Sequence, residues 1–275
     1  MLHPETIVAT PLGMYEALSP SLKITGVHLN SLSKGPDSVV WAPPVRSLPP
    51  VPMFEVMTEA GYSVRLCGDA SVITYDTAPE STPVKDCQDK RAMVFIGFAE
   101  DTGLSTPSRD MAMRAGLLDC RRAPLPVLKG DISVRLSWIR GVVEGFGFIA
   151  RESLYFPDSK ILQTVLLSVG IPSIKDDAGL SIPHFWIHEF CQFIQPSALR
   201  QDLMRILNNS TYIPQYTPHG NRQDLLESGH SYFRNFARSV FLSRITSVKG
   251  IEPAYGYRWA ASEGIATVAD GILVS

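Results

Sequence analysis

Three potential metal ligands fall at helical spacing in the second half of the chain. His184, His188 and Cys191 stand at positions i, i+4 and i+7, so a helix would place all three on one face. Imidazole and thiolate groups are both ligands that zinc accepts. His188 and Glu189 begin an HExxH motif, but Gln192 stands where the second histidine belongs. We therefore interpret this segment as a core helix with hydrogen-bonded histidines, and we expect no metal and no cofactor.

A second chemical pattern is the glycine-rich stretch at the middle of the chain. Gly145, Gly147 and Ala150 match the relaxed GxGxxA form of a dinucleotide-binding loop. That loop works only between a strand and a helix whose N-terminus receives the pyrophosphate, and no amphipathic helix follows here. The sequence also contains no P-loop and no GxSxG nucleophile elbow. These patterns favour a protein that is not an enzyme, with a site assembled from distant residues around His184 and His188 as the alternative.

Arginines gather with aromatic residues towards the C-terminus. We expect a helix within 222–247, on which Arg234 and Arg238 share a face and Arg244 follows almost three turns after the first. Arg200 and Arg205 precede it, and residues 195–258 hold eight lysines and arginines against four acids. Such a surface suits contact with phosphates and stacking on bases. The five arginines are therefore candidate nucleic-acid-binding residues, RNA included, and a solvated helix face is the plainer alternative.

The N-terminal segment carries short motifs of the kind that recruit partners. Tyr15 and Leu18 form a Y-x-x-L motif, and Trp41–Pro52 contains the pairs Pro43-Pro44 and Pro49-Pro50. Motifs of this kind, on a proline-broken arm ahead of a β-rich domain, resemble the recruiting arms of viral matrix proteins. The resemblance covers this segment alone, which has neither PPxY nor PTAP. Binding of the prolines in a partner's aromatic groove is one interpretation, and a rigid surface connector is the other.

Composition sets wider limits on the protein. The 275 residues are 45% hydrophobic and 19% charged, which is typical of a folded globular chain. The net charge of −2 gives no global attraction to nucleic acid or to an anionic membrane, so any such binding needs a local patch. The four cysteines never form a CxxC pair, and neither a signal peptide nor an apolar run long enough to span a bilayer is present. These features predict an intracellular, cytoplasmic protein with free thiols.

The elements that would position these residues follow from periodicity. Within Ile132–Phe156, apolar residues alternate with polar ones, which predicts two strands joined near the glycines at 141 and 145. Strands are also expected within 53–75 and 91–98. Helices are expected at 108–120, 159–169, 184–194 and 197–207. The sequence thus predicts an α+β fold: a flexible arm (1–21), a β-rich domain of about six to eight strands (22–157) and a mainly helical region (158–275).

Three functions are compatible with the sequence. The first is a non-enzymatic structural or interaction protein, of the self-assembling matrix or capsid type found in viruses, that forms homo-oligomers and binds nucleic acid or membrane partners. The second is the enzyme with a site assembled from distant residues. The third is a dedicated nucleic-acid-binding protein that uses the arginines of 195–258.

Overall fold

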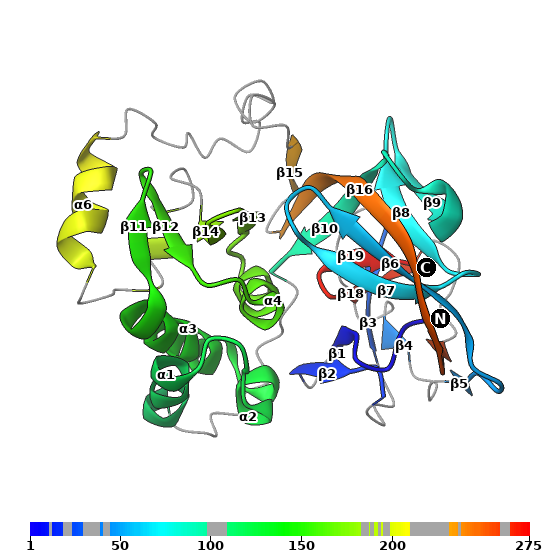
Figure 1. Cartoon of the computed structure of the whole chain (residues 1–275), viewed down its shortest axis with the longest axis horizontal. Helices are drawn as coiled ribbons and strands as arrows, with labels where there is room; N and C mark the ends of the chain where they lie inside the picture. The colour runs from blue at the N-terminus through cyan, green and yellow to red at the C-terminus, as the bar shows by residue number, and fades with distance from the viewer. Residues whose placement is uncertain are drawn as a thin grey trace. The chain divides into compact units, whose positions relative to one another are not determined.

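The computed structural model describes most of the chain. It describes residues 1–10, 13–18, 24–29, 39–40, 45–97, 109–182, 187, 190–191, 194, 199–209, 231–235, 238–258 and 265–275. Two compact units share the chain, and the first of them is discontinuous. Unit 1 consists of Met1–Phe98 and Asn221–Ser275, and unit 2 is Ala99–Gly220 (Figure 1). The two units meet at residues 98–99 and 220–221, whereas the boundaries expected from the sequence are at residues 21 and 157.

Unit 1 is built from strands. They are β1 (Ile7–Thr10), β2 (Gly13–Glu16), β3 (Ile24–His28), β4 (Val39–Val40), β5 (Val45–Arg46), β6 (Val51–Thr58), β7 (Ser63–Cys67), β8 (Ser71–Tyr75), β9 (Pro79–Pro83), β10 (Arg91–Ile96), β15 (Ser231–Asn235), β16 (Arg238–Ala254), β17 (Tyr257–Arg258), β18 (Ile265–Ala269) and β19 (Ile272–Val274), with a 3-10 turn at Val84–Asp86. The main path of the large sheet is β2-β1-β18-β19-β8-β10-β16-β6-β7, and β5 pairs with β17 apart from it.

Strand formation in the first hundred residues follows the local sequence. β10 is buried along its length except at Arg91, as expected of an apolar run at the centre of a sheet. β6 and β7 form a hairpin whose turn uses Gly61 with a φ of 86°, a value that favours glycine. The predicted strands within 53–75 and 91–98 are therefore confirmed.

The segment 1–21, expected as a flexible arm, contains two paired strands. β1 and β2 pair with each other, and Val8 of β1 faces Ala269 of β18. Val8, Ala9 and Met14 are buried, so this segment belongs to the core of unit 1. The prolines of this segment stand outside the two short strands.

The expected helix within 222–247 is also wrong, because its described residues form β15 and β16. β16 is 17 residues long and pairs antiparallel with β15 and β10 through its first half and with β6 through its second. Val240, Leu242 and Ile245 are buried. The apolar residues at three- and four-residue steps imitated a helix, but pairing with strands far away in sequence decides the structure.

Unit 2 combines helices with a small antiparallel sheet. Its elements are α1 (Arg109–Leu118), α2 (Leu125–Lys129), α3 (Ile132–Phe146), β11 (Phe148–Ala150), β12 (Ser153–Phe156), α4 (Lys160–Ser168), β13 (Ile174–Asp176), β14 (Gly179–Ile182) and α6 (Arg200–Asn209). The strands lie in the order β11-β12-β14-β13. The side chain of Ser159 caps α4 by accepting a hydrogen bond from the backbone N–H of Leu162. The predicted helices at 108–120 and 159–169 are confirmed by α1 and α4.

The first half of Ile132–Phe156 is a helix and not the expected strand. Asp131 accepts a hydrogen bond from the backbone N–H of Val134 at 2.9 Å and so caps α3. Val134, Trp138 and Val142 are buried at four-residue steps, which is helical spacing. The alternating residues at 132–138 fit a strand equally well over seven positions, and the cap and the longer period decide against it.

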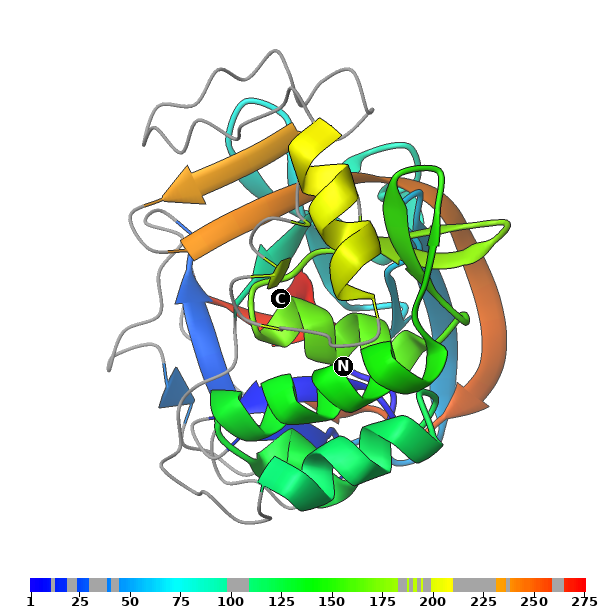
Figure 2. The same cartoon turned by 90° about the vertical axis from the view of Figure 1, so that its left-hand side faces the viewer.

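Glycines in unit 2 bring α1 and α3 into close contact. A Cβ atom added at Gly116 would overlap the carbonyl oxygen of Trp138, and one added at Gly141 would overlap that of Met113. At Gly145 the added atom would lie 2.9 Å from the carbonyl oxygen of Leu117. The two helices lie side by side in both views (Figures 1 and 2). The glycines at 141 and 145 are therefore a contact surface between helices and not the turn between strands that we expected.

These observations overturn the expected fold class. Strands outweigh helices in the described residues, and they form a thirteen-stranded and a four-stranded sheet rather than one sheet of about six to eight strands. The C-terminal part of the chain supplies β15–β19 and is not a helical half. Helices gather instead in unit 2, in the middle of the sequence.

Candidate nucleic-acid interface

Helix α6 carries two of the predicted arginines on a surface of unit 2. Leu203 and Ile206, three residues apart, are buried and fix one side of the helix. Leu199, just before the helix, lies against Gly147, where an added Cβ atom would come within 3.2 Å of its Cδ1. The other side of α6 faces solvent. The sequence predicts this amphipathic helix correctly at 197–207, and the structure places it at Arg200–Asn209.

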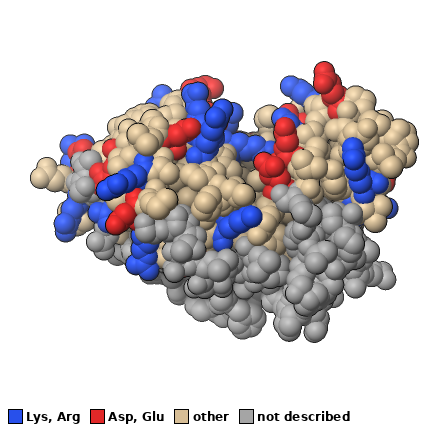
Figure 3. Space-filling view, turned by 90° about the horizontal axis from the view of Figure 1, so that it is seen from below, with Lys and Arg blue, Asp and Glu red and all other residues tan. Residues whose placement is uncertain are grey.

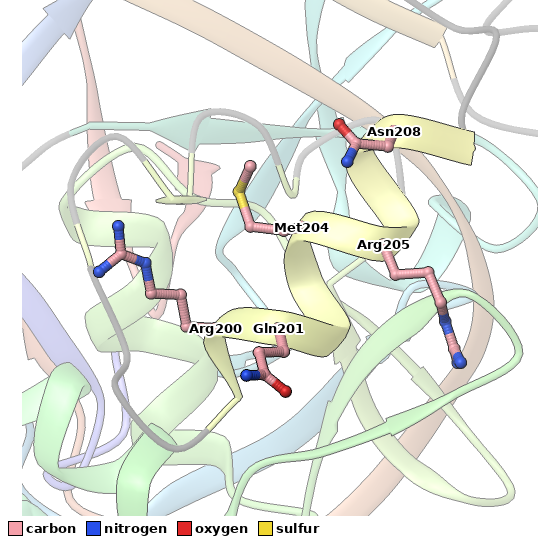
Figure 4. Close-up of a pocket in the computed structure, with 5 residues that line it drawn as sticks. All are labelled: Arg200, Gln201, Met204, Arg205 and Asn208. Carbon is pink, nitrogen blue, oxygen red and sulfur yellow. The ribbon is translucent and has the colours of Figure 1, made fainter.

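An open pocket of about 560 Å³ lies along the solvent side of α6 (Figure 4). Its described lining is Arg200, Gln201, Met204, Arg205 and Asn208. These positions are i, i+1, i+4, i+5 and i+8, which is one face of a helix. Figure 4 shows the two guanidinium groups reaching towards opposite sides of the helix. The face thus offers separated positive charges with amide groups and one thioether between them.

Both arginines of α6 are exposed to solvent. Neither forms an ion pair or a hydrogen bond with another residue in the part of the chain that the structure describes. Arg65, by contrast, binds Glu5 at 3.2 Å and Glu55 at 3.1 Å. Guanidinium groups without a protein partner keep all their donors for an anion such as phosphate.

The other three predicted arginines belong to unit 1 and share no helix. Arg234 lies in β15 opposite Ser239, and Arg238 lies in β16 opposite Asn235. Arg244 is exposed on β16, and its Nε lies 3.7 Å from Glu59. The structure therefore brings Arg200 and Arg205 together on α6, and it does not form the arginine helix that we expected within 222–247.

The histidines of the expected metal pattern, His184 and His188, lie outside the described residues. Cys191 is half-buried, and burial raises the pKa of its thiol to about 11, so that the thiol stays protonated near neutral pH. Within the described ranges, no group of three or more His, Cys, Asp or Glu side chains is placed to hold a metal ion.

One thiol of unit 1 has a carboxylate partner. Cys67 donates a hydrogen bond to Asp69, whose other oxygen lies 3.5 Å from Arg258. Burial, followed by this hydrogen bond, raises the pKa of Cys67, and the same bond lowers the pKa of Asp69. A buried, protonated thiol is a poor nucleophile.

The predicted partner-binding residues are held in different ways. Tyr15 is half-buried in β2 opposite Val8, whereas Leu18 is 56% exposed. This pairing in a sheet is not the arrangement of a free linear motif. Pro49 and Pro50 are exposed in the segment before β6, and Pro43 and Pro44 lie outside the described residues. Groove binding by the prolines stays a prediction.

No protein-family model matches this chain, and no curated protein matches it in sequence. No helix in the described part of the chain is long and apolar enough to cross a membrane.

Sequence reasoning missed Gln201, Met204 and Asn208 as parts of the site. Their signal was present, because they share the spacing of Arg200 and Arg205 around the buried Leu203 and Ile206. Unlike the arginines, these three side chains carry no charge.

Proposed function

We propose that this protein binds nucleic acid through unit 2, with α6 as a main contact. The observation that carries the proposal is the pair of exposed arginines, Arg200 and Arg205, which have no partner among the described residues and lie on one helix face. Arginines that neutralise phosphates release counterions, and this release favours binding regardless of sequence. Gln201 and Asn208 on the same face add neutral hydrogen-bonding groups.

Charge elsewhere in unit 2 limits the strength of this binding. Residues 99–220 contain twelve lysines and arginines and twelve acids, so the unit has no net attraction for phosphates. In the view of Figure 3, basic and acidic side chains of the described surface are interspersed. Two phosphate contacts predict that log K falls with log salt at a slope of about −2, or about tenfold in affinity between 50 and 200 mM salt.

The test measures binding of labelled single-stranded RNA, single-stranded DNA and duplex DNA by fluorescence anisotropy at several salt concentrations. Replacing both arginines (Arg200→Ala/Arg205→Ala) should lower the affinity about tenfold and remove most of the salt slope. The matched control is Arg121→Ala/Arg122→Ala, which removes the same charge from two other exposed residues of unit 2. Absence of salt-dependent binding by the parent protein, or equal affinity of the two double variants, would contradict the proposal.

A second candidate function, self-association, is supported by an apolar surface around α1. Met111, Leu118 and Leu125 are 63%, 82% and 53% exposed, an unusual degree for such side chains in one short segment. Light scattering behind a sizing column tests this function across a range of protein concentrations. A concentration-dependent mass that Leu118→Lys abolishes supports homo-oligomer formation, and a constant monomer mass contradicts it. An enzymatic site around His184 and His188 stays a hypothesis.

A further inference from the structure

We infer that α6 is a recognition helix that enters the major groove of double-stranded DNA and contacts base edges. This inference rests on the proposed nucleic-acid binding and goes further, because it names the form of nucleic acid and predicts sequence preference. It is carried by the types of side chain on the exposed face, their arrangement around the helix, and what that face lacks.

The exposed side chains of α6 are those that read bases. Arginine forms paired hydrogen bonds with the O6 and N7 atoms of guanine, and asparagine and glutamine do so with N6 and N7 of adenine. Gln201 and Asn208 suit the second kind of contact. Arg200 and Arg205 lie at the two ends of the face, where a guanidinium group can reach either a guanine edge or the phosphates that flank the groove. Met204, 49% exposed between them, suits apolar contact with a thymine methyl group. A surface that only held phosphates would not need the amides.

The geometry of the helix suits the groove. At about 100° per residue, the five side chains occupy an arc of about 140° around α6, which is one face of the helix. From Arg200 to Asn208 they extend about 12 Å along the axis, or the height of three to four base pairs. The major groove of B-form DNA, about 12 Å wide, admits one helix. Asp202 is exposed but falls outside this arc, so its carboxylate need not face the phosphates.

The types of the five described side chains favour duplex DNA over other partners. Proteins that hold single strands stack bases on aromatic side chains, and none of the five residues is aromatic. The major groove of an RNA duplex is too narrow and deep for side chains to read. Central residues of protein–protein interfaces are enriched in aromatic and other apolar side chains, whereas here Met204 is the single apolar member of the described lining.

The buried side of α6 fixes the orientation of its exposed side chains. Leu203 and Ile206 are 2% and 6% exposed, so the side of the helix opposite the five residues is buried. A helix held in this way presents its side chains at fixed spacing, which base recognition requires.

The test is selection of bound DNA from duplexes with a randomised central segment, followed by sequencing, with the full-length protein. The parent should enrich a short motif of three to four base pairs. The variant Gln201→Ala/Asn208→Ala keeps its charge, so its salt slope should not change, whereas its preference at the affected positions should fall about tenfold each. Arg121→Ala/Arg122→Ala should select the same motif as the parent.

The outcomes separate the two proposals. Three results would overturn the inference while nucleic-acid binding stands. The first is salt-dependent binding without an enriched motif, and the second is the same motif from Gln201→Ala/Asn208→Ala as from the parent. The third is an affinity for an RNA duplex or for single strands that equals the affinity for duplex DNA. Failure of the parent to bind any nucleic acid would overturn both. Circular dichroism of each variant checks that the exposed substitutions leave the fold intact.

Discussion

Alanine at Gly141 should destabilise unit 2, although alanine is the better helix former. In an open helix the change would stabilise the protein by about 1 kcal/mol. At this position the new methyl group would overlap the backbone carbonyl oxygen of Met113, well inside the 3.0 Å that real Cβ atoms keep. A carbonyl in the middle of α1 cannot rotate away, so the two helices must separate.

The size of the effect follows from these opposing contributions. Overpacking of a core costs about 1–3 kcal/mol, and a clash with backbone on a crossing of two helices lies at the upper end. Subtracting the helix-forming gain of about 1 kcal/mol leaves a net loss of about 2 kcal/mol. For a unit of this size that loss lowers the midpoint of thermal unfolding by roughly 6–10 °C.

Calorimetry measures the midpoint, and hydrogen exchange assigns the loss to a region. Because the chain has two units, one unfolding transition cannot be assumed, and exchange of the amides of α1 and α3 should report the change directly. Gly250→Ala is the matched control, since an added Cβ atom at this strand position of unit 1 meets nothing within 4 Å. An unchanged or higher midpoint for Gly141→Ala, with protection of α1 and α3 intact, would refute the close helix crossing.

Three further predictions each concern a single side chain. Asp131→Ala removes the cap that accepts from the Val134 N–H and should cost about 1 kcal/mol of unfolding free energy, measured by urea denaturation. Tyr155→Phe removes the hydrogen bond that the hydroxyl donates to Asp176 at 2.9 Å; it should cost about 1 kcal/mol and leave the far-UV spectrum unchanged, and a loss of several kcal/mol would contradict this role. Burial raises the pKa of Cys87 to about 11, so the folded state resists ionisation of this thiol. Stability should be full below the ordinary thiol pKa of about 8.5 and fall as pH rises towards 11, and Cys87→Ala should flatten this alkaline loss in melting experiments.

Local patterns in the sequence predict the parts of the fold that local contacts decide. α4 has its cap at Ser159, and the hairpin of β6 and β7 has its turn glycine at position 61. For these elements the spacing of the apolar residues agrees with the cap or turn residue at the end of the element, and the prediction is right. The same reasoning finds α6, because Leu203 and Ile206 set its buried side.

Elements decided by distant partners escape this reasoning. β1 is held by β18, and β16 by β10 and β6, all far away in sequence, so neither strand is evident from its own residues. In α3 the alternation at 132–138 hides a helix whose real signal is the four-residue spacing of Gly141 and Gly145, typical of close helix contacts. For the site, the arginines of α6 were predictable. The positions of Arg234 and Arg238 were not, because they depend on the pairing of β15 with β16.

The place of β16 in unit 1 has a consequence for how the protein is made. Its neighbours β10 and β6 belong to the first hundred residues, but β16 begins only at residue 238, after all of unit 2. During synthesis, unit 2 emerges from the ribosome as one continuous piece and can fold before the sheet of unit 1 is complete. Until β16 arrives, β10 and β6 each present an open edge to the surroundings. Completion of unit 1 is thus a late, long-range and slow step, and it is the stage at which the nascent chain is most exposed to aggregation.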